Sequence, residues 1–252
     1  MTRKLKESLR RMFPRSVRPH QILAGPLRGN LLVTCWHDYP AAILGTTERP
    51  LLEWFQQTVR PGETWLDIGA HYGYTAIALS RLVGSEGRVM AFEPVAATAG
   101  CVARARMLNG LRQLTVVSAA LSDCDDLAVG TLPQVRGMVD STVEGAAMEE
   151  PFLMARLDWL WPRIAGGNES IDGVKIDVQG MEIRVLRGMT GILRRNKPRL
   201  AIELHHGVPR DELLDVLANA GYSMPGSPIE PLPGESAARY EDDRSYAFVA
   251  RP

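Results

Sequence analysis

The sequence contains few cysteines and has no long apolar run. Cys35, Cys101 and Cys124 are its three cysteines, and their spacing fits neither a metal-binding motif nor a redox pair. No stretch has the length and apolar character of a signal peptide or of a membrane-spanning helix. The formal net charge is zero, so the composition gives no sign of a nucleic-acid partner. We therefore expect a cytoplasmic protein that binds no nucleic acid and whose thiols are buried or incidental.

The charge is nevertheless concentrated in the first eighteen residues. This segment, residues 1–18, has one acid, Glu7, and seven bases: Arg3, Lys4, Lys6, Arg10, Arg11, Arg15 and Arg18. Its apolar residues Leu5, Leu9, Met12 and Phe13 fall at helical spacing. The pattern is typical of a solvated arm, and also of a short amphipathic helix that lies on an anionic membrane surface or brings the protein to a lipid-linked substrate.

Apolar strands alternate with helical patterns along most of the chain, which predicts a single α/β domain with a Rossmann-like, mostly parallel sheet. Seven strands are predicted at about 64–69, 88–93, 114–120, 173–178, 199–205, 221–224 and 245–251. Helices are predicted at about 73–83, 96–109, 181–194 and 210–220. The segment 225–243 is rich in proline, glycine and charge, so we expect the last two strands to form an antiparallel hairpin at the sheet edge.

Two segments add to this pattern. Residues 1–50 are predicted to form the basic arm and a small β extension with a strand at 29–36, and residues 51–252 the main domain, beginning with a helix at 51–60. The segment 125–170 has only weak strand and helix patterns. A loop of that length after the third strand is often functional, because ligands enter open α/β sheets at this edge.

A strand runs through a glycine turn directly into a helix at Trp65–Leu79. Gly69 and Gly73 permit a sharp turn and a close approach to a ligand, while the amides from about Tyr72 to Ala76 are unpaired donors. A dinucleotide site would read G-x-G-x-x-G, whereas this turn reads D-x-G-A-x-x-G and keeps the carboxylate of Asp67 ahead of the glycine. A carboxylate repels phosphate but can neutralise, directly or through water, the cationic amino-acid end of S-adenosylmethionine. The turn therefore favours that cofactor over a dinucleotide.

Further cofactor contacts are expected at the ends of the next two strands. Glu93, followed by Pro94, ends the second strand, where a carboxylate is suited to bind the two hydroxyls of a ribose. His71 can contact the cofactor carboxylate or the acceptor, or simply fill the turn. Ser122 and Asp123 follow the third strand, where the adenine edge would lie; Asp123 either accepts a hydrogen bond from the exocyclic amine or forms a turn.

Polar residues also end the fourth and fifth strands, at the same edge of the predicted sheet. They are Lys175 and Asp177 on one face of a strand, Glu182 at the turn into the next helix, Glu203 and His205 in phase, and His206 on the opposite face. Methyl transfer to a hydroxyl requires alignment and removal of a proton. Asp177 and His205 are the candidates for that base, and Lys175 could orient a carboxylate or polarise an acceptor oxygen. Either candidate base could instead cap a helix or bond loop amides.

The same residue types also suit a divalent metal. Asp177, Glu203 and His205 could act as its ligands, since carboxylates and imidazole bind such ions. The sequence has no tight ligand-spacing motif there, so a metal is not favoured and the prediction names no metal site.

Taken together, these motifs resemble the FkbM family of S-adenosylmethionine-dependent methyltransferases. The resemblance covers about residues 63–224 and rests on five segments: Asp67–Thr75, Phe92–Pro94, Ala120–Asp123, Lys175–Gly188 and Ala201–His205. The resemblance implies a class I methyltransferase fold and O-methylation of a hydroxyl on a sugar, glycolipid, polyketide or other secondary metabolite. It also implies cofactor roles for Asp67, Gly69, Glu93 and Asp123. The acceptor side would then lie around Lys175, Asp177, Glu182, Glu203 and His205. Gln179 stands where the family often has Glu, which removes one carboxylate from any metal cluster.

Two alternatives stay open at this point. A nucleotide-linked oxidoreductase would need a glycine turn compatible with pyrophosphate, which Asp67 disfavours. A non-catalytic module that binds the cofactor would not need the polar residues that end three strands. The sequence leaves open whether the protein is a monomer or a homodimer.

Overall fold

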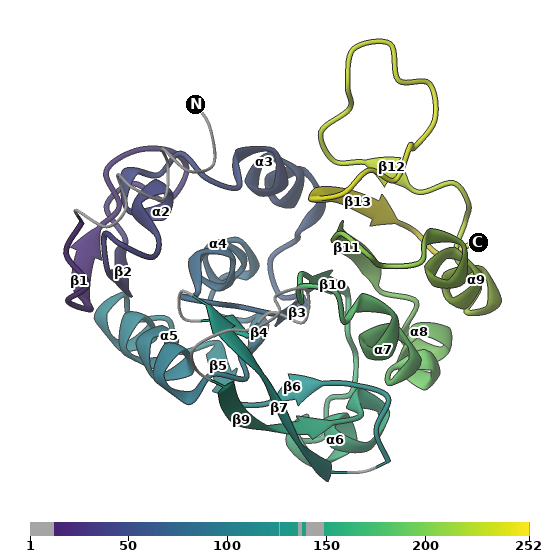
Figure 1. Cartoon of the computed structure of the whole chain (residues 1–252), viewed down its shortest axis with the longest axis horizontal. Coiled ribbons are helices and arrows are strands. Elements are labelled where there is room, and N and C mark those ends of the chain that lie inside the picture. The colour runs from purple at the N-terminus through teal and green to yellow at the C-terminus, as the bar shows by residue number, and fades with distance from the viewer. Residues whose placement is uncertain (1–12, 126, 136–137, 140–148, 252) are drawn as a thin grey trace.

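The computed structural model describes residues 13–125, 127–135, 138–139 and 149–251. Its centre is a seven-stranded sheet with the order β12-β13-β11-β10-β3-β4-β5 (Figure 1). The strands are β3 (Thr64–Ile68), β4 (Arg88–Phe92), β5 (Leu114–Val117), β10 (Gly173–Ile176), β11 (Arg199–Leu204), β12 (Ser227–Pro228) and β13 (Arg244–Phe248). Neighbouring strands from β5 to β11 pair in parallel, and β13 is antiparallel to both β11 and β12. The expected mostly parallel α/β sheet is therefore confirmed.

Helices cover both faces of this sheet and explain why its central strands β3 and β10 are buried along their whole length. On one face lie α3 (Arg49–Thr58), α4 (Tyr74–Val83) and α5 (Ala96–Leu108), and on the other lie α6 (Leu157–Ile164), α7 (Glu182–Arg187), α8 (Thr190–Asn196) and α9 (Arg210–Asn219). Each layer has its own buried core, with Phe55, Trp65 and Val102 in the first and Trp161, Leu186 and Leu217 in the second.

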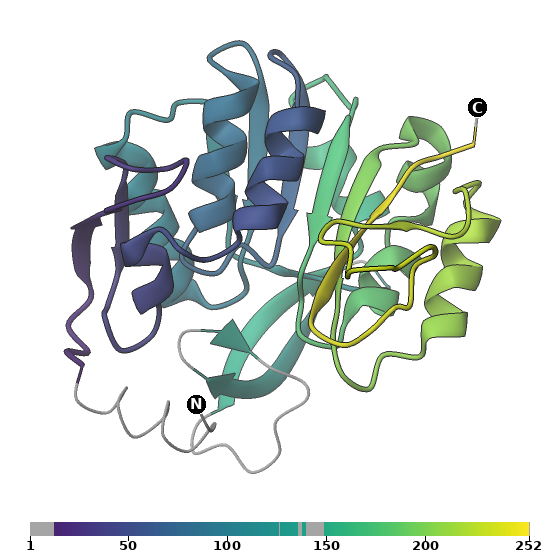
Figure 2. The same cartoon turned by 90° about the horizontal axis from the view of Figure 1, so that it is seen from above.

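A second sheet is built from the segment whose sequence pattern was weak. It contains β6 (Ala120–Leu121), β7 (Leu127–Val135), β8 (Met138–Val139) and β9 (Glu149–Ala155), in the order β6-β9-β7-β8. Seven residue pairs join β7 to β9 in antiparallel register. Figure 2 shows that this ribbon projects beyond the main sheet. Gly130 and Pro133 interrupt the alternation of β7, which is why its sequence gave a weak strand signal.

The N-terminal part forms a small addition beside α5. It consists of the antiparallel strands β1 (Arg18–Gln21) and β2 (Leu31–Thr34), followed by α2 (Pro40–Leu44). The Asn109 side chain at the end of α5 accepts a hydrogen bond of 2.8 Å from the Leu31 amide and donates one of 2.7 Å to the Leu31 carbonyl. These two hydrogen bonds connect the addition to the main domain. The predicted amphipathic helix falls mainly on residues 1–12, outside the described part of the chain.

The structure corrects two expected elements. The single helix predicted at 181–194 is two helices, α7 and α8, because the backbone leaves the helical conformation at Met189, with a φ of −129°, and the Asp158 carboxylate accepts from the Gly191 and Ile192 amides at the start of α8. The strand predicted at 221–224 is wrong as well. Tyr222 makes one isolated bridge to Ala250, and the antiparallel partner of β13 at the sheet edge is instead β12.

Candidate active site

A cavity of about 300 Å³ opens at the carboxyl ends of the central strands. One side is lined by the turn after β3 and the ends of β4 and β6, including Gly69, His71, Glu93, Pro94 and Leu121. The other side is lined by Lys175, Asp177, Gln179 and Glu203 from the ends of β10 and β11, together with Tyr39 and Glu48 from the N-terminal part. The cavity thus joins the two groups of residues that the sequence predicted, the cofactor turn and the polar strand ends.

The glycine turn is held in place by backbone contacts that only glycine permits. Gly69 has a φ of 79°, and a Cβ at this position would lie 1.8 Å from the carbonyl oxygen of Asp177. The amides of Gly69 and Ala70 both donate to the Phe92 carbonyl at 3.0 Å. Gly73, with a φ of 86°, precedes the first residue of α4 and packs against Val102. The turn therefore brings the ends of β3, β4 and β10 together at the floor of the cavity.

Beneath the turn, Lys175 joins two carboxylates. Its ammonium lies 3.3 Å from Oδ1 of Asp67 and 3.2 Å from Oδ2 of Asp177, and it donates to the Gly69 carbonyl at 2.9 Å. Although burial favours the neutral amine, the Asp177 and Asp67 carboxylates raise the pKa of Lys175, so the side chain stays charged.

Asp67 is placed behind this turn rather than in the cavity. Its side chain is fully buried, and Oδ2 accepts a hydrogen bond of 2.7 Å from the Thr75 hydroxyl. Burial raises the pKa of Asp67 against the effect of Lys175. The structure places Asp67 in contact with Thr75 and Lys175 and outside the cavity lining, whereas the sequence suggested a direct or water-mediated contact with the ligand.

Glu93 lines the cavity at the end of β4, as expected for a ribose ligand. Its two oxygens accept one backbone hydrogen bond each, from His71 at 2.8 Å and from Val95 at 3.0 Å. A carboxylate has about four acceptor positions, so both oxygens can accept another bond from a sugar hydroxyl. Burial raises the pKa of Glu93 to about 7. These residues fit the cofactor: Glu93 is aimed where a ribose would lie and the glycine turn supports the adjoining wall.

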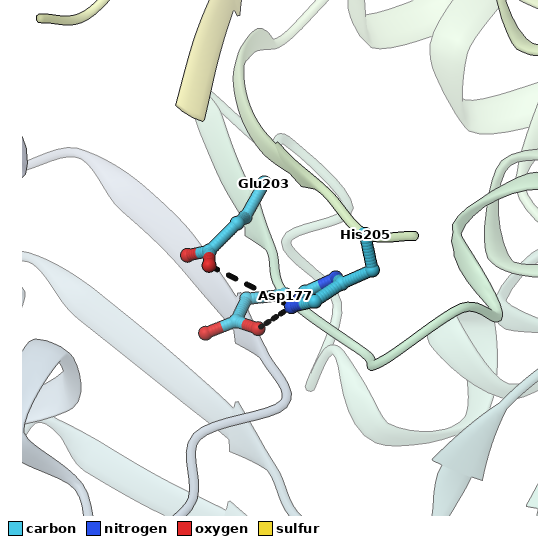
Figure 3. Close-up of side chains that lie close together, drawn as sticks. All are labelled: Asp177, Glu203 and His205. Atoms are coloured by element: carbon cyan, nitrogen blue, oxygen red, sulfur yellow. Dashed lines mark ion pairs between the residues drawn. The ribbon is translucent and has the colours of Figure 1, made fainter. Parts of the chain in front are cut away.

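Three side chains meet at the ends of β10 and β11, as Figure 3 shows. Asp177 and Glu203 line the cavity, whereas His205 contacts both of them without lining it. Nε2 of His205 lies 3.5 Å from Oδ1 of Asp177 and 3.6 Å from Oε1 of Glu203. We call these three residues the acidic cluster. The Asp177 carboxylate, together with burial, raises the pKa of Glu203 to about 8. In contrast, Lys175 and His205 lower the pKa of Asp177 against the effect of burial, so Asp177 is the ionised member at neutral pH.

His205 is oriented by a buried carboxylate from α7. Its Nδ1 lies 2.6 Å from Oε1 of Glu182, whose side chain is fully buried, and its Nε2 lies 2.7 Å from the side-chain nitrogen of Gln179. Burial opposes protonation, but the hydrogen bond to Glu182 and the Asp177 carboxylate raise the pKa of His205 to about 9. Glu182 therefore positions the imidazole and does not line the cavity, although the sequence suggested that it binds the acceptor.

Several predicted residues lie away from the cavity lining. His206 is exposed and pairs with Asp242 at 2.8 Å. Asp123 pairs with Arg184 at 2.8 Å, next to the buried Ser122. Tyr72 donates to Asp38 at 2.6 Å. The structure thus places these residues outside the cavity lining.

Tyr39 and Glu48 are among the lining residues that the sequence argument missed. Tyr39 and Glu48 come from the segment before α3 and lie among the aromatic and acidic side chains of the cavity. Glu48 has a φ of 54°, a left-handed conformation uncommon for a residue other than glycine, and burial followed by the Asp177 carboxylate raises its pKa. Neither residue belongs to a motif, so no local signal could have identified them.

Comparisons with known proteins agree with this arrangement. Residues 67–224 match the family described as Methyltransferase FkbM domain. Among solved structures, the chain is similar to Aeropyrum pernix fibrillarin in complex with S-adenosyl-L-methionine, at 12% identity and a TM-score of 0.50, with 93% of this chain and 83% of that chain covered. It is also similar to a methyltransferase FkbM from Methylobacillus flagellatus KT, at 18% identity and a TM-score of 0.49, with 83% of this chain and 52% of that chain covered. A search of curated proteins returns no similar sequence.

The sheet order, the glycine turn and the acidic residue after β4 define a class I methyltransferase fold that uses S-adenosylmethionine. Because the matched segment spans more than half of the chain, the protein belongs to the FkbM methyltransferase family. It is therefore a methyltransferase, and its acceptor is the question that the cavity raises.

Proposed function

We propose that this methyltransferase transfers the methyl group of S-adenosylmethionine to a hydroxyl group of a small-molecule or glycan acceptor. The observation that carries the proposal is the acidic cluster beside the glycine turn: Asp177 and Glu203 line the cavity, and His205 contacts both of them from outside the lining. Transfer to a hydroxyl needs a nearby group that takes up its proton, whereas the methyl group itself moves by in-line displacement. The cluster supplies carboxylate and imidazole groups at the required end of the cavity.

Each residue has a distinct part in this proposal. Asp177 is ionised and lines the cavity, so it receives the hydroxyl proton and becomes neutral, while the adjacent His205 holds its carboxyl group in place. Lys175 fixes the position of Asp177 relative to the glycine turn, because its ammonium contacts the Asp177 carboxylate and the Gly69 carbonyl. Glu93 binds the ribose hydroxyls of the cofactor. The bound cofactor supplies the methyl group and a sulfonium leaving group.

The charge of the cavity favours a small polar acceptor over a nucleic acid. Three carboxylates, Glu48, Asp177 and Glu203, line the acceptor side. A phosphodiester chain would be repelled there, whereas the hydroxyls of a sugar or polyketide can donate hydrogen bonds to these groups. The zero net charge of the chain is consistent with this preference.

The test is methyl transfer from labelled S-adenosylmethionine to a panel of hydroxylated acceptors, with ribosomal RNA and a protein lysate as comparison substrates. We expect labelled ether in at least one sugar or polyketide, and Asp177→Asn lowers this turnover while S-adenosylhomocysteine still binds. Labelling of RNA or protein alone would contradict the acceptor class, and failure of the purified chain to bind S-adenosylhomocysteine would contradict the cofactor site.

The place of action that we propose is the cytoplasm, with the basic segment 1–18 contacting anionic membranes that carry a lipid-linked acceptor. Among the described residues, no helix combines the length and apolarity needed to cross a bilayer. Seven bases against one acid supply the attraction to anionic lipid. Vesicles with and without phosphatidylserine test this step: the full chain should sediment with the anionic vesicles, and a chain lacking residues 1–18 should not.

A further inference from the structure

Carboxyl groups outnumber basic groups around the acidic cluster. Six of them lie in this part of the molecule: Asp67, Glu93, Asp177, Glu182, Glu203 and Glu48. Lys175 lies among them, but its ammonium is already engaged by Asp67, Asp177 and the Gly69 carbonyl. Carboxyl groups as close together as those of Asp177 and Glu203 need either a proton or a cation between them. The site is therefore able to accept a cationic occupant on the acceptor side, beyond the lysine.

The separations within the cluster fit a metal ion better than direct hydrogen bonds. Oδ1 of Asp177 and Oε1 of Glu203 lie 3.5 and 3.6 Å from Nε2 of His205, and one donor atom of each residue lies within 4.8 Å of the others. Hydrogen bonds between such atoms are usually about 2.7–3.2 Å long. Donor atoms about 2.1 Å from one metal ion at tetrahedral angles are separated by roughly 3.4 Å.

The surroundings of His205 give a second, independent indication. Glu182 approaches Nδ1 from behind, at 2.6 Å, which leaves Nε2 directed at Asp177 and Glu203. A carboxylate on the far nitrogen is the usual outer partner of a metal-binding imidazole, since it fixes the ring and increases its basicity. Glu182 is fully buried, and its Oε2 has no hydrogen-bond partner among the residues that the structure describes. Its buried negative charge is stabilised when the imidazole in front of it binds a cation.

We infer that Asp177, Glu203 and His205 bind one divalent cation at the acceptor side of the cavity, with Glu182 as the outer partner of the imidazole. Two carboxylate oxygens and one imidazole nitrogen suit Mn²⁺, and the side chain of Gln179, next to Nε2, can present its amide oxygen as a further ligand after rotation. The sequence argument did not favour a metal because no spacing motif marks these residues. The ligands come from two strand ends that the fold brings together.

The inference rests on the proposed function for its role in catalysis. An acceptor hydroxyl bound to the cation would lose its proton more readily, and its oxygen would be held beside the cofactor turn. Asp177 and His205 then act as ligands, and the cation replaces them in activating the hydroxyl. Glu48, another carboxylate that lines this side of the cavity, is left to receive the proton.

Binding of Mn²⁺ to the chelator-treated full chain tests the inference directly. Electron paramagnetic resonance measures free Mn²⁺ during the titration, and calorimetry with S-adenosylhomocysteine is run on the same samples. We expect one Mn²⁺ per chain, with affinity at least tenfold weaker in Glu203→Gln and Asp177→Asn. Glu53→Gln, which removes an exposed carboxylate on α3, serves as the matched control and should keep the affinity of the original chain.

The outcomes separate this inference from the proposed function. Absence of Mn²⁺ binding in a chain that binds S-adenosylhomocysteine would overturn the metal site and leave the methyltransferase site intact. Mn²⁺ binding that Glu203→Gln and Asp177→Asn do not weaken would overturn it as well, because the ion would then be bound elsewhere. Cluster-dependent Mn²⁺ binding without S-adenosylhomocysteine binding would support the metal site and contradict the proposed function.

Discussion

Replacing Lys175 by methionine removes the positive charge that holds two carboxylates under the glycine turn. The ammonium is 5% exposed and lies 3.3 Å from Asp67 and 3.2 Å from Asp177, while Asp67 is fully buried. Removing one partner of such a buried pair costs about 3–5 kcal/mol, because the remaining charge stays buried without compensation. At about 2–4 °C per kcal/mol for a chain of this size, the melting temperature should fall by roughly 6–20 °C.

The pH dependence of this loss follows from the remaining carboxylate. Burial already raises the pKa of Asp67, and the loss of Lys175 raises it further. The folded variant then binds a proton at a higher pH than the unfolded chain does, so its stability is lost as the pH rises through that value and recovers as the pH falls. The difference in melting temperature from the original protein should therefore be smaller at pH 5 than at pH 8.

Thermal unfolding followed by circular dichroism measures both effects. Lys197→Met is the matched control, since Lys197 is exposed at the end of α8, and it should change stability by no more than about 0.5 kcal/mol. Adding Asp67→Asn to Lys175→Met should restore part of the loss. A melting temperature for Lys175→Met within about 2 °C of the original at pH 8, or no recovery in the double variant, would refute the reasoning.

Three further substitutions test the two sides of the cavity. Glu93→Gln should weaken S-adenosylhomocysteine binding by roughly tenfold to a hundredfold, since hydrogen bonds to a charged group contribute about 1.5–3 kcal/mol. In the original protein, calorimetry should show the affinity falling between pH 8 and pH 6, because burial raises the pKa of Glu93 to about 7 and only the ionised form accepts hydrogen bonds from both ribose hydroxyls. The affinity of the variant should not change over this pH range. Asp177→Asn should lower kcat by at least about a hundredfold, with the dissociation constant of S-adenosylhomocysteine within threefold of the original; full activity would remove Asp177 from the mechanism. The melting temperature of Gly69→Ala should be well below that of Gly62→Ala. Both glycines have a positive φ, but only at Gly69 would a Cβ meet backbone, 1.8 Å from the Asp177 carbonyl oxygen. Equal melting temperatures of the two variants would contradict that clash.

The main sheet could be predicted because its strands and helices carry strong local patterns. Strands β3, β4, β10 and β11 are short apolar runs bounded by turn residues, and each lies within a residue or two of its predicted position. Helix α7 could not be separated from α8, because the carboxylate that accepts from the first amides of α8 belongs to Asp158 on α6, far away in the sequence. The pattern of a helix does not contain such a contact.

Site residues could be predicted from the sequence only where they belong to a local motif. The glycine turn and Glu93 were found from spacing, and the structure places both at the cavity. Asp67 lies on a strand buried on both faces, so alternation could not tell whether its carboxylate points to a ligand or to Thr75 and Lys175. Glu48 reaches the cavity through a loop in the N-terminal part, and its position depends on how that part packs.

The residues that line the cavity come from two different parts of the chain, and this division bears on how the cavity can change in evolution. Tyr39 and Glu48 lie before the segment 67–224 that matches the family, whereas Gly69, Glu93 and Asp177 lie within it. Mutations in the first fifty residues can therefore reshape one part of the lining while the part that belongs to the family segment keeps its residues. Exchanging residues 1–50 for those of a relative is the natural route to changing what the cavity accepts.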